Sequence, residues 1–247
     1  MGIYAEAGNR GAGLNFMAWQ RPQEVFPMQT NSNSMSGPGG VWLATGTLLL
    51  AAALVFHGPP DADLSVQMQN IAEGHGRWAT VHWTAAAALF LIAGASFLNL
   101  ALNPRVRHSP MLSSAWMVMA LGALTTFSTA VAEASVVAVA ADRGDTNAFM
   151  TWWAFSGGMG NGFWALALAT ALVAYHDARD NVGILPRWAA IVGSAFGILS
   201  AAGWTLGEQL GIGIGGPIWL ISSLLMCLWL AWYGLSSSSV RSGQATA

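Results

Sequence analysis

Six long apolar runs follow a polar N-terminal segment. They cover residues 41–57, 79–102, 111–140, 147–175, 188–207 and 213–235. Each run is close to or above the roughly 20 residues that a helix needs to cross a bilayer. Lipid offers the backbone no hydrogen-bond partners, and the runs lack the alternation of barrel strands, so helices are predicted. The pattern therefore predicts an all-α integral membrane protein with a bundle of six transmembrane helices.

The polar flanks define the predicted domain organisation. Residues 1–40 are rich in Gly, Asn, Ser, Gln and Pro, residues 41–235 hold the six spans, and residues 236–247 form a short C-terminal tail. A segment with the composition of residues 1–40 cannot bury a core of its own. We therefore expect it to be ordered by contact with another membrane protein subunit.

Composition agrees with the membrane class and excludes several chemistries. The chain is 54% hydrophobic and 8% charged, whereas a soluble domain carries about a quarter charged residues. It contains no lysine, which excludes a P-loop lysine and a retinal Schiff base. A net charge of −2 gives no basic surface for nucleic acid. No His-Glu-x-x-His, Cys-x-x-Cys or Gly-x-Ser-x-Gly motif is present, which favours a non-catalytic protein.

The arginines predict the orientation in the membrane. Seven of the nine fall on the side of the N-terminal segment, the second and fourth loops and the C-terminus, and only Arg77 and Arg143 fall on the other side. The positive-inside rule then places both termini in the cytoplasm. We expect a multi-pass protein of the bacterial inner membrane, in contact with bound lipids.

Glu133 is a carboxylate within the third apolar run. At 1.5 Å per residue it lies about 10 Å below the outer surface, and His82 in the second run lies at a similar depth. A charged carboxylate facing lipid is costly, so Glu133 is expected to face protein or water. Three interpretations remain open: a protonated acid in an interhelical hydrogen bond, a pair with His82, or a part of a ligand, proton or metal site.

Other polar and aromatic residues gather near the same end of the predicted bundle. Trp152 and Trp153 can form the wall of a pocket, whereas Trp42, Trp78, Trp152, Trp188, Trp204 and Trp219 fall near helix ends, as headgroup-level tryptophans do. The candidate ligand-binding residues are His57, His82, Glu133, Trp152, Trp153 and Glu208.

Histidines also raise the question of a metal or haem. The candidate metal ligands are His57, His75 and His82, and with Glu133 they offer a nitrogen and oxygen donor set. His57 and His82, on adjacent helices, can also serve as two axial haem ligands. Gly74 and Gly76 are expected to break the helix between His75 and His82. No spacing is diagnostic, so the cofactor stays open.

Small residues predict where helices approach closely. The Gly-x-x-x-Gly spacing occurs at Gly158/Gly162, Gly193/Gly197 and Gly207/Gly211. The stretch "GGMGNG" at 157–162 lies in the middle of a run and predicts either a close helix contact or a local break.

The stretch "ILPRWAAIVGSAFGILSAAGW" (184–204) carries a family resemblance. Through Leu185, Pro186, Arg187, Gly193 and Gly197 it resembles the entry to the fifth helix in a large family of six-helix bacterial membrane proteins of unknown function. The resemblance implies the six-helix fold and supplies no site.

Three functions are compatible with these patterns. The first is a non-catalytic subunit of a larger membrane assembly, contacted through residues 1–40. The second is a binder or carrier of a small apolar ligand, a quinone or haem at the outer-leaflet His/Glu/Trp cluster. The third is a proton-coupled transporter that uses Glu133.

The predicted orientation can be tested by labelling. Cysteines introduced at Asp63 and Asp145 should react with a membrane-impermeant thiol reagent in intact cells, and a cysteine at Asp180 should not. Labelling at position 180 alone would reverse the orientation.

Overall fold

The computed structural model describes residues 37–58, 61, 63–180 and 183–239. Within these ranges the chain is helical and contains no strand. Six helical segments are long and apolar enough to cross a membrane, which confirms the six predicted runs. They comprise α1 (Gly37–His57), α3 (His75–Leu102), α5 (Pro110–Ala132) continued by η1 (Glu133–Val137) and α6 (Ala138–Asp142), α7 (Thr146–Arg179), α8 (Arg187–Trp204) continued by η2 (Thr205–Gln209), and α9 (Gly215–Ser239).

Two short helices lie in the connections. α2 (Leu64–Glu73) occupies the connection between α1 and α3, and its Asp63 N-cap accepts a hydrogen bond from the backbone N–H of Ser65. Hydrogen bonds from Ser65 lower the pKa of this exposed carboxyl. α4 (Pro104–His108) links α3 to α5, with Asn103 as its N-cap.

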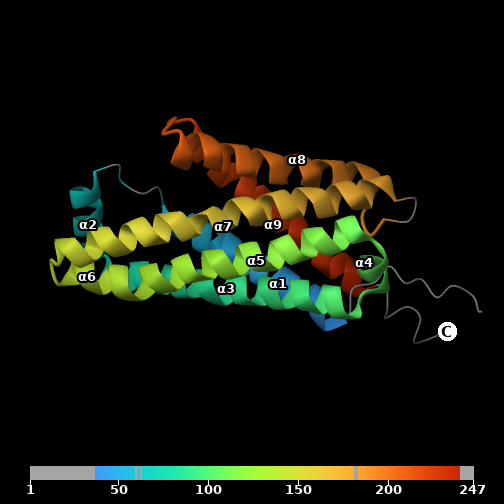
Figure 1. The fold of residues 1–247 in the computed structure, drawn as a ribbon, viewed down its shortest axis with the longest axis horizontal. Helices are drawn as coiled ribbons and strands as arrows, with labels where there is room; N and C mark the ends of the chain where they lie inside the picture. The colour runs from blue at the N-terminus through green and yellow to red at the C-terminus, as the bar shows by residue number, and fades with distance from the viewer. Residues whose placement is uncertain (1–36, 59–60, 62, 181–182, 240–247) are drawn as a thin grey trace, which may run out of the picture. The chain divides into compact units, whose positions relative to one another are not determined.

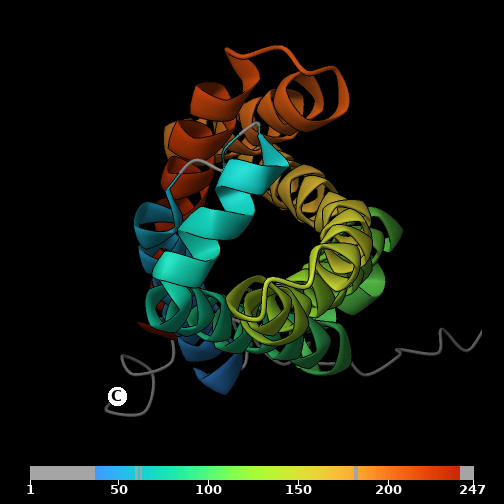
Figure 2. The ribbon, with the colours of Figure 1, turned by 90° about the vertical axis from the view of Figure 1, so that its left-hand side faces the viewer.

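The long helices form a closed ring. Each packs against two neighbours in the order α1, α3, α5, α7, α8, α9 and back to α1. Figure 2, which looks at one end of the ribbon, shows the helices arranged around a central space with α2 across that end. Consecutive helices run in opposite directions along the bundle (Figure 1), and an even number of them closes the ring with antiparallel neighbours.

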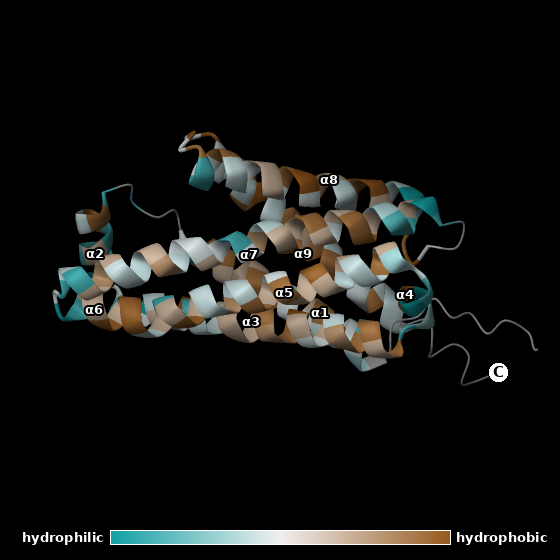
Figure 3. Ribbon diagram, viewed as in Figure 1, coloured by the Kyte–Doolittle hydropathy of each residue, from teal (hydrophilic) through white to brown (hydrophobic). Residues whose placement is uncertain are grey.

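Polar residues mark the two ends of the ring. Figure 3 shows hydrophilic residues at the helix ends and mostly apolar or neutral residues between them. Many large apolar side chains on the outer faces are exposed, such as Phe90 (58%), Leu121 (55%) and Ile191 (53%). Soluble proteins rarely leave so much contiguous apolar surface exposed, so these faces suit contact with lipid.

Glycines allow the closest helix contacts. A Cβ added to Gly162 would lie 2.6 Å from the carbonyl oxygen of Gly122, and one added to Gly122 would lie 2.6 Å from the carbonyl oxygen of Gly162. α5 and α7 therefore touch through bare backbone. Of the two predictions for "GGMGNG", the close contact is confirmed and the local break is wrong, because α7 is a continuous helix from Thr146 to Arg179.

Glycines close the ring as well. Gly40 of α1 and Gly234 of α9 make the same kind of reciprocal contact, at 2.5 and 2.6 Å. Gly193 leaves room for the ring of Trp229, and Gly197 lies against Ala167 and Ala171 of α7. Both glycines of the "GSAFG" stretch thus have a packing role.

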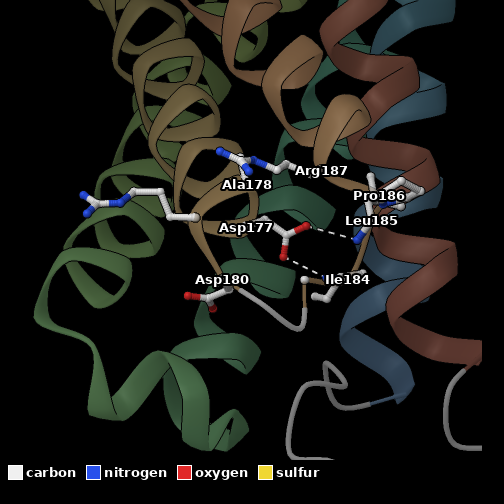
Figure 4. A pocket seen from close by; sticks show the side chains of 9 residues that line it. Asp177, Ala178, Asp180, Ile184, Leu185, Pro186 and Arg187 are labelled. Atoms are coloured by element: carbon white, nitrogen blue, oxygen red, sulfur yellow. Dashed lines mark hydrogen bonds between the residues drawn. The ribbon is translucent and has the colours of Figure 1, made fainter.

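A buried acid organises the end of the bundle that carries the arginines. The side chain of Asp177, 1% exposed, pairs with Arg105 at 3.2 Å. Its carboxylate also accepts the backbone N–H groups of Ile184 (2.9 Å) and Leu185 (3.0 Å), as Figure 4 shows. These bonds tie the end of α7 to the segment that enters α8 and to α4.

Two glycines of one helix should respond oppositely to alanine. Gly162→Ala places a methyl group against backbone and should destabilise the protein by about 1–3 kcal/mol. Gly158→Ala meets no atom within 4 Å and should stabilise α7 by up to about 1 kcal/mol. Thermal unfolding in detergent checks both signs. Equal effects of the two substitutions would contradict the contact.

Candidate functional site

The end of the bundle that carries α2 contains a cavity inside the ring. Its volume is about 190 Å³, it is partly open, and its lining is mostly apolar. All six long helical segments contribute to the wall. The polar lining residues are His57, His82, Thr126, Thr129, Glu133, Ser156 and Glu208.

Glu133 and His82 form the central polar contact of this cavity. His82 Nε2 lies 2.7 Å from Glu133 Oε2, with the two side chains 6% and 12% exposed. The hydroxyl of Ser156 donates to Glu133 Oε1. Glu133 thus faces the bundle, as expected, and it contacts His82, which was one of the three interpretations left open. Ser156 is a partner that the sequence did not single out.

The local backbone at Glu133 departs from a regular α-helix. The residue begins the π-helical segment η1, which interrupts the third span. A second π-helical segment, η2, carries Glu208 at the end of α8. π-turns within helices are frequent at functional sites. Both carboxylates that line the cavity therefore come from irregular turns, which the apolar pattern of the sequence did not reveal.

Both imidazoles of the cavity have one nitrogen engaged with the backbone. His82 Nδ1 lies 2.8 Å from the carbonyl oxygen of Trp78. His57 Nδ1 lies 2.6 Å from the carbonyl oxygen of Gly58, whose φ of 72° suits glycine. A carbonyl only accepts hydrogen bonds, so both Nδ1 atoms carry a hydrogen. In the neutral rings the free lone pair is therefore on Nε2.

Aromatic rings surround the polar residues. Trp78 lies against both imidazoles, with centroid distances of 5.0 Å to His57 and 4.4 Å to His82. Trp204 and Trp219 line the cavity in T-shaped contact at 5.4 Å. Trp78 is buried, and Trp204 and Trp219 line the cavity, so all three rings face the interior of the bundle.

The remaining sequence candidates separate into two groups. Trp153 and Glu208 line the cavity, whereas Trp152 is exposed and does not. His57, His82 and Glu133 offer ligand atoms that all lie within 4.8 Å of one another, and His75 is outside this group. The break predicted between His75 and His82 is wrong, because α3 begins at His75 and continues through Gly76.

A second polar site, around Asp177 at the opposite end, is structural. Its two carboxylate oxygens are already used by two backbone N–H groups and by Arg105. Residues 177–180 and 183–187 line a polar hollow at this end. Both carboxylate oxygens of Asp177 in this hollow already accept hydrogen bonds from the protein itself.

Comparison with known proteins does not add to this picture. No family model, curated protein or solved structure shows a significant match to the chain. The candidate site is therefore defined by its own geometry.

The hydrogen bonds of Glu133 predict different effects for two substitutions. In Glu133→Gln the amide can accept from Ser156 and donate to His82 Nε2, so both bonds are rebuilt and the stability loss should be small. Glu133→Ala leaves both partners unpaired and should cost about 1–3 kcal/mol. Thermal unfolding in detergent separates them. Equal losses for the two variants would show that these hydrogen bonds do not stabilise the bundle.

Proposed function

We propose that this chain is a multi-pass membrane protein that binds a small, single-ring molecule in the cavity at the α2 end. The observation that carries the proposal is an apolar cavity with a buried His82–Glu133 pair on its wall. Binding sites for small molecules are commonly apolar, with a few convergent polar groups that fix orientation.

The size of the cavity limits its occupant. An apolar cavity of about 150 Å³ holds one benzene molecule, so about 190 Å³ suits one substituted ring. Haem is too large for this volume. His57 and His82 are also in direct edge contact at 5.0 Å between centroids, which leaves no space for a porphyrin between them as axial ligands.

The lining favours an aromatic or quinone ring with oxygen substituents. Phe163, Trp153, Trp204 and Trp219 supply aromatic surface, which packs well against another ring. The indole N–H of Trp219 has no hydrogen-bond partner among the described residues and is a donor for a carbonyl oxygen, whereas Glu133 and Ser156 can accept from a hydroxyl group. A quinone head group has both an aromatic-sized ring and such oxygens.

The orientation proposed from the arginines places this cavity toward the outer leaflet of the inner membrane. Arg105, Arg107, Arg179 and Arg187 belong to connections at the opposite end. The hypothesis of an assembly subunit held by residues 1–40 stays a prediction, because residues 1–36 lie outside the described ranges. Proton-coupled transport by Glu133 also stays a prediction.

Adjacent glycines provide a matched test of binding. Gly157 lines the cavity and has no atom within 4 Å of an added Cβ, whereas Gly158 is equally free of contacts but does not line the cavity. Gly157→Leu should therefore fill the cavity, and Gly158→Leu should not. Both substitutions replace glycine in the same helix, so their effects on α7 itself are comparable.

The probe is ubiquinone with a single isoprene unit, added to purified protein in detergent after treatment with EDTA. We expect saturable quenching of tryptophan fluorescence in the unmodified protein and in Gly158→Leu. Gly157→Leu should bind at least about tenfold more weakly, equivalent to about 1.4 kcal/mol. Identical titrations of all three proteins would overturn the proposal.

A further inference from the structure

Three side chains from different helices converge at the wall of the cavity. His57 ends α1, His82 lies in the second turn of α3, and Glu133 begins η1. Their potential ligand atoms all lie within 4.8 Å of one another. His57 and His82 are 25 positions apart in sequence, and His82 and Glu133 are 51 positions apart. The packing of the helices therefore brings them together, because no local sequence motif could.

The surroundings of these residues match those of metal ligands. A histidine that binds a metal normally donates its other ring N–H to a carbonyl or carboxylate, which fixes the tautomer. Nδ1 of His57 and Nδ1 of His82 each make such a bond to a backbone carbonyl. Ser156 in turn holds the second oxygen of Glu133. The outer hydrogen bonds of a metal site are thus already formed.

The contact between His82 and Glu133 requires a proton between its two atoms. His82 Nε2 carries a lone pair in the neutral ring, and a carboxylate oxygen only accepts hydrogen bonds. The two atoms are nevertheless 2.7 Å apart. Two acceptors at this distance repel each other unless a proton lies between them. Metal ligands lose such protons when an ion binds, so a metal ion can replace this proton once the two atoms move apart.

We infer that His57, His82 and Glu133 bind one divalent transition-metal ion. Two imidazoles and one carboxylate suit Zn²⁺, Fe²⁺ and Co²⁺, whereas Ca²⁺ and Mg²⁺ require mainly oxygen ligands. Metal–ligand bonds of about 2.0–2.2 Å place ligand atoms roughly 3–3.5 Å apart. Binding then requires side-chain shifts of about 1 Å and no change of fold.

The site also has a route for the ion and a free coordination position. His57 lines both the cavity and a separate polar cleft beneath α2, which includes Asn70, Glu73 and Arg77. An ion can therefore reach His57 from the aqueous end of the bundle. Three protein ligands leave at least one coordination position open, as in sites where a metal contacts an exchangeable molecule.

This inference of a metal site goes beyond the proposed binding of a small, single-ring molecule in the cavity. The three ligands hold an ion whether or not the cavity contains an organic molecule. An oxygen of a molecule in the cavity can take the open position, which joins the two sites without making either one depend on the other.

The test is a titration of the full-length protein with Co²⁺ alone, in detergent after EDTA treatment. Co²⁺ bound by nitrogen and oxygen ligands has visible absorption bands, so the spectrum reports the ligands directly. We expect one equivalent to bind, and Zn²⁺ to displace it. His57→Ala removes a ligand, and Glu133→Gln replaces an anionic ligand with a neutral amide. Loss of an outer hydrogen-bond partner alone costs about 10–100-fold, so each variant should weaken binding on the order of 100-fold or more.

The variants and control separate metal binding from folding. His57→Ala leaves the His82–Glu133 pair intact, and Glu133→Gln rebuilds its two hydrogen bonds, so both proteins should keep helical circular dichroism. His75→Ala removes a partly buried histidine of the same helix as His82 but outside the cluster, and it should bind Co²⁺ like the unmodified protein.

Two results would overturn the inference. One is the absence of Co²⁺ and Zn²⁺ binding at micromolar concentrations in the unmodified protein. The other is unchanged binding in folded His57→Ala and Glu133→Gln. The quinone titration uses metal-free protein and different variants. Neither of these results would therefore decide whether the cavity binds a quinone.

Discussion

Closure of the helix ring is the constraint on which the rest of this structure depends. Six antiparallel helices in a ring enclose a space that their own backbones do not fill, so side chains must fill it. The ring stays narrow because backbone meets backbone at Gly122 and Gly162 and again at Gly40 and Gly234. In lipid, where apolar burial gives no net driving force between helices, such close packing supplies much of the association energy.

The interior is filled differently at the two ends of the ring. Trp116, Trp229 and Tyr233 pack together in one half. The ring centroid of Tyr233 lies 5.2 Å from that of Trp229 and 6.5 Å from that of Trp116. The other half has Ala85, Ala130, Gly157 and Gly160 on its wall, and these small residues leave the cavity. His82, Glu133 and Ser156 lie in this second half, where they contact one another and are kept from lipid.

The same few atoms of the candidate site hold three helices together and supply the polar groups of the proposed binding site. The carboxylate of Glu133 links α5 to α3 through His82 and to α7 through Ser156. This contact needs a shared proton, so proton binding at this position is coupled to the packing of three helices. The π-turn at Glu133 places the carboxylate within the ring. A small aromatic or quinone molecule in the cavity, or a metal ion at the histidines, would each change the contacts that Glu133 makes with His82 and Ser156.

The sequence by itself determined the class of the protein, the six spans and the depth of its polar residues. Length, hydropathy and the 1.5 Å rise of a helix fix where a residue lies along the bundle axis, and this placed His82 and Glu133 at the same level. What the sequence did not determine is the direction in which each residue faces around its helix. The apolar runs are hydrophobic on all sides, because lipid and protein interior select similar side chains, so they carry no amphipathic signal. For this reason the inward orientation of Trp78, Trp204 and Trp219 was not predicted, the role of Ser156 was missed, and His75 was grouped with His57. Only the tertiary structure decided these faces, because the closed order of the helices determines which side of each helix points inward.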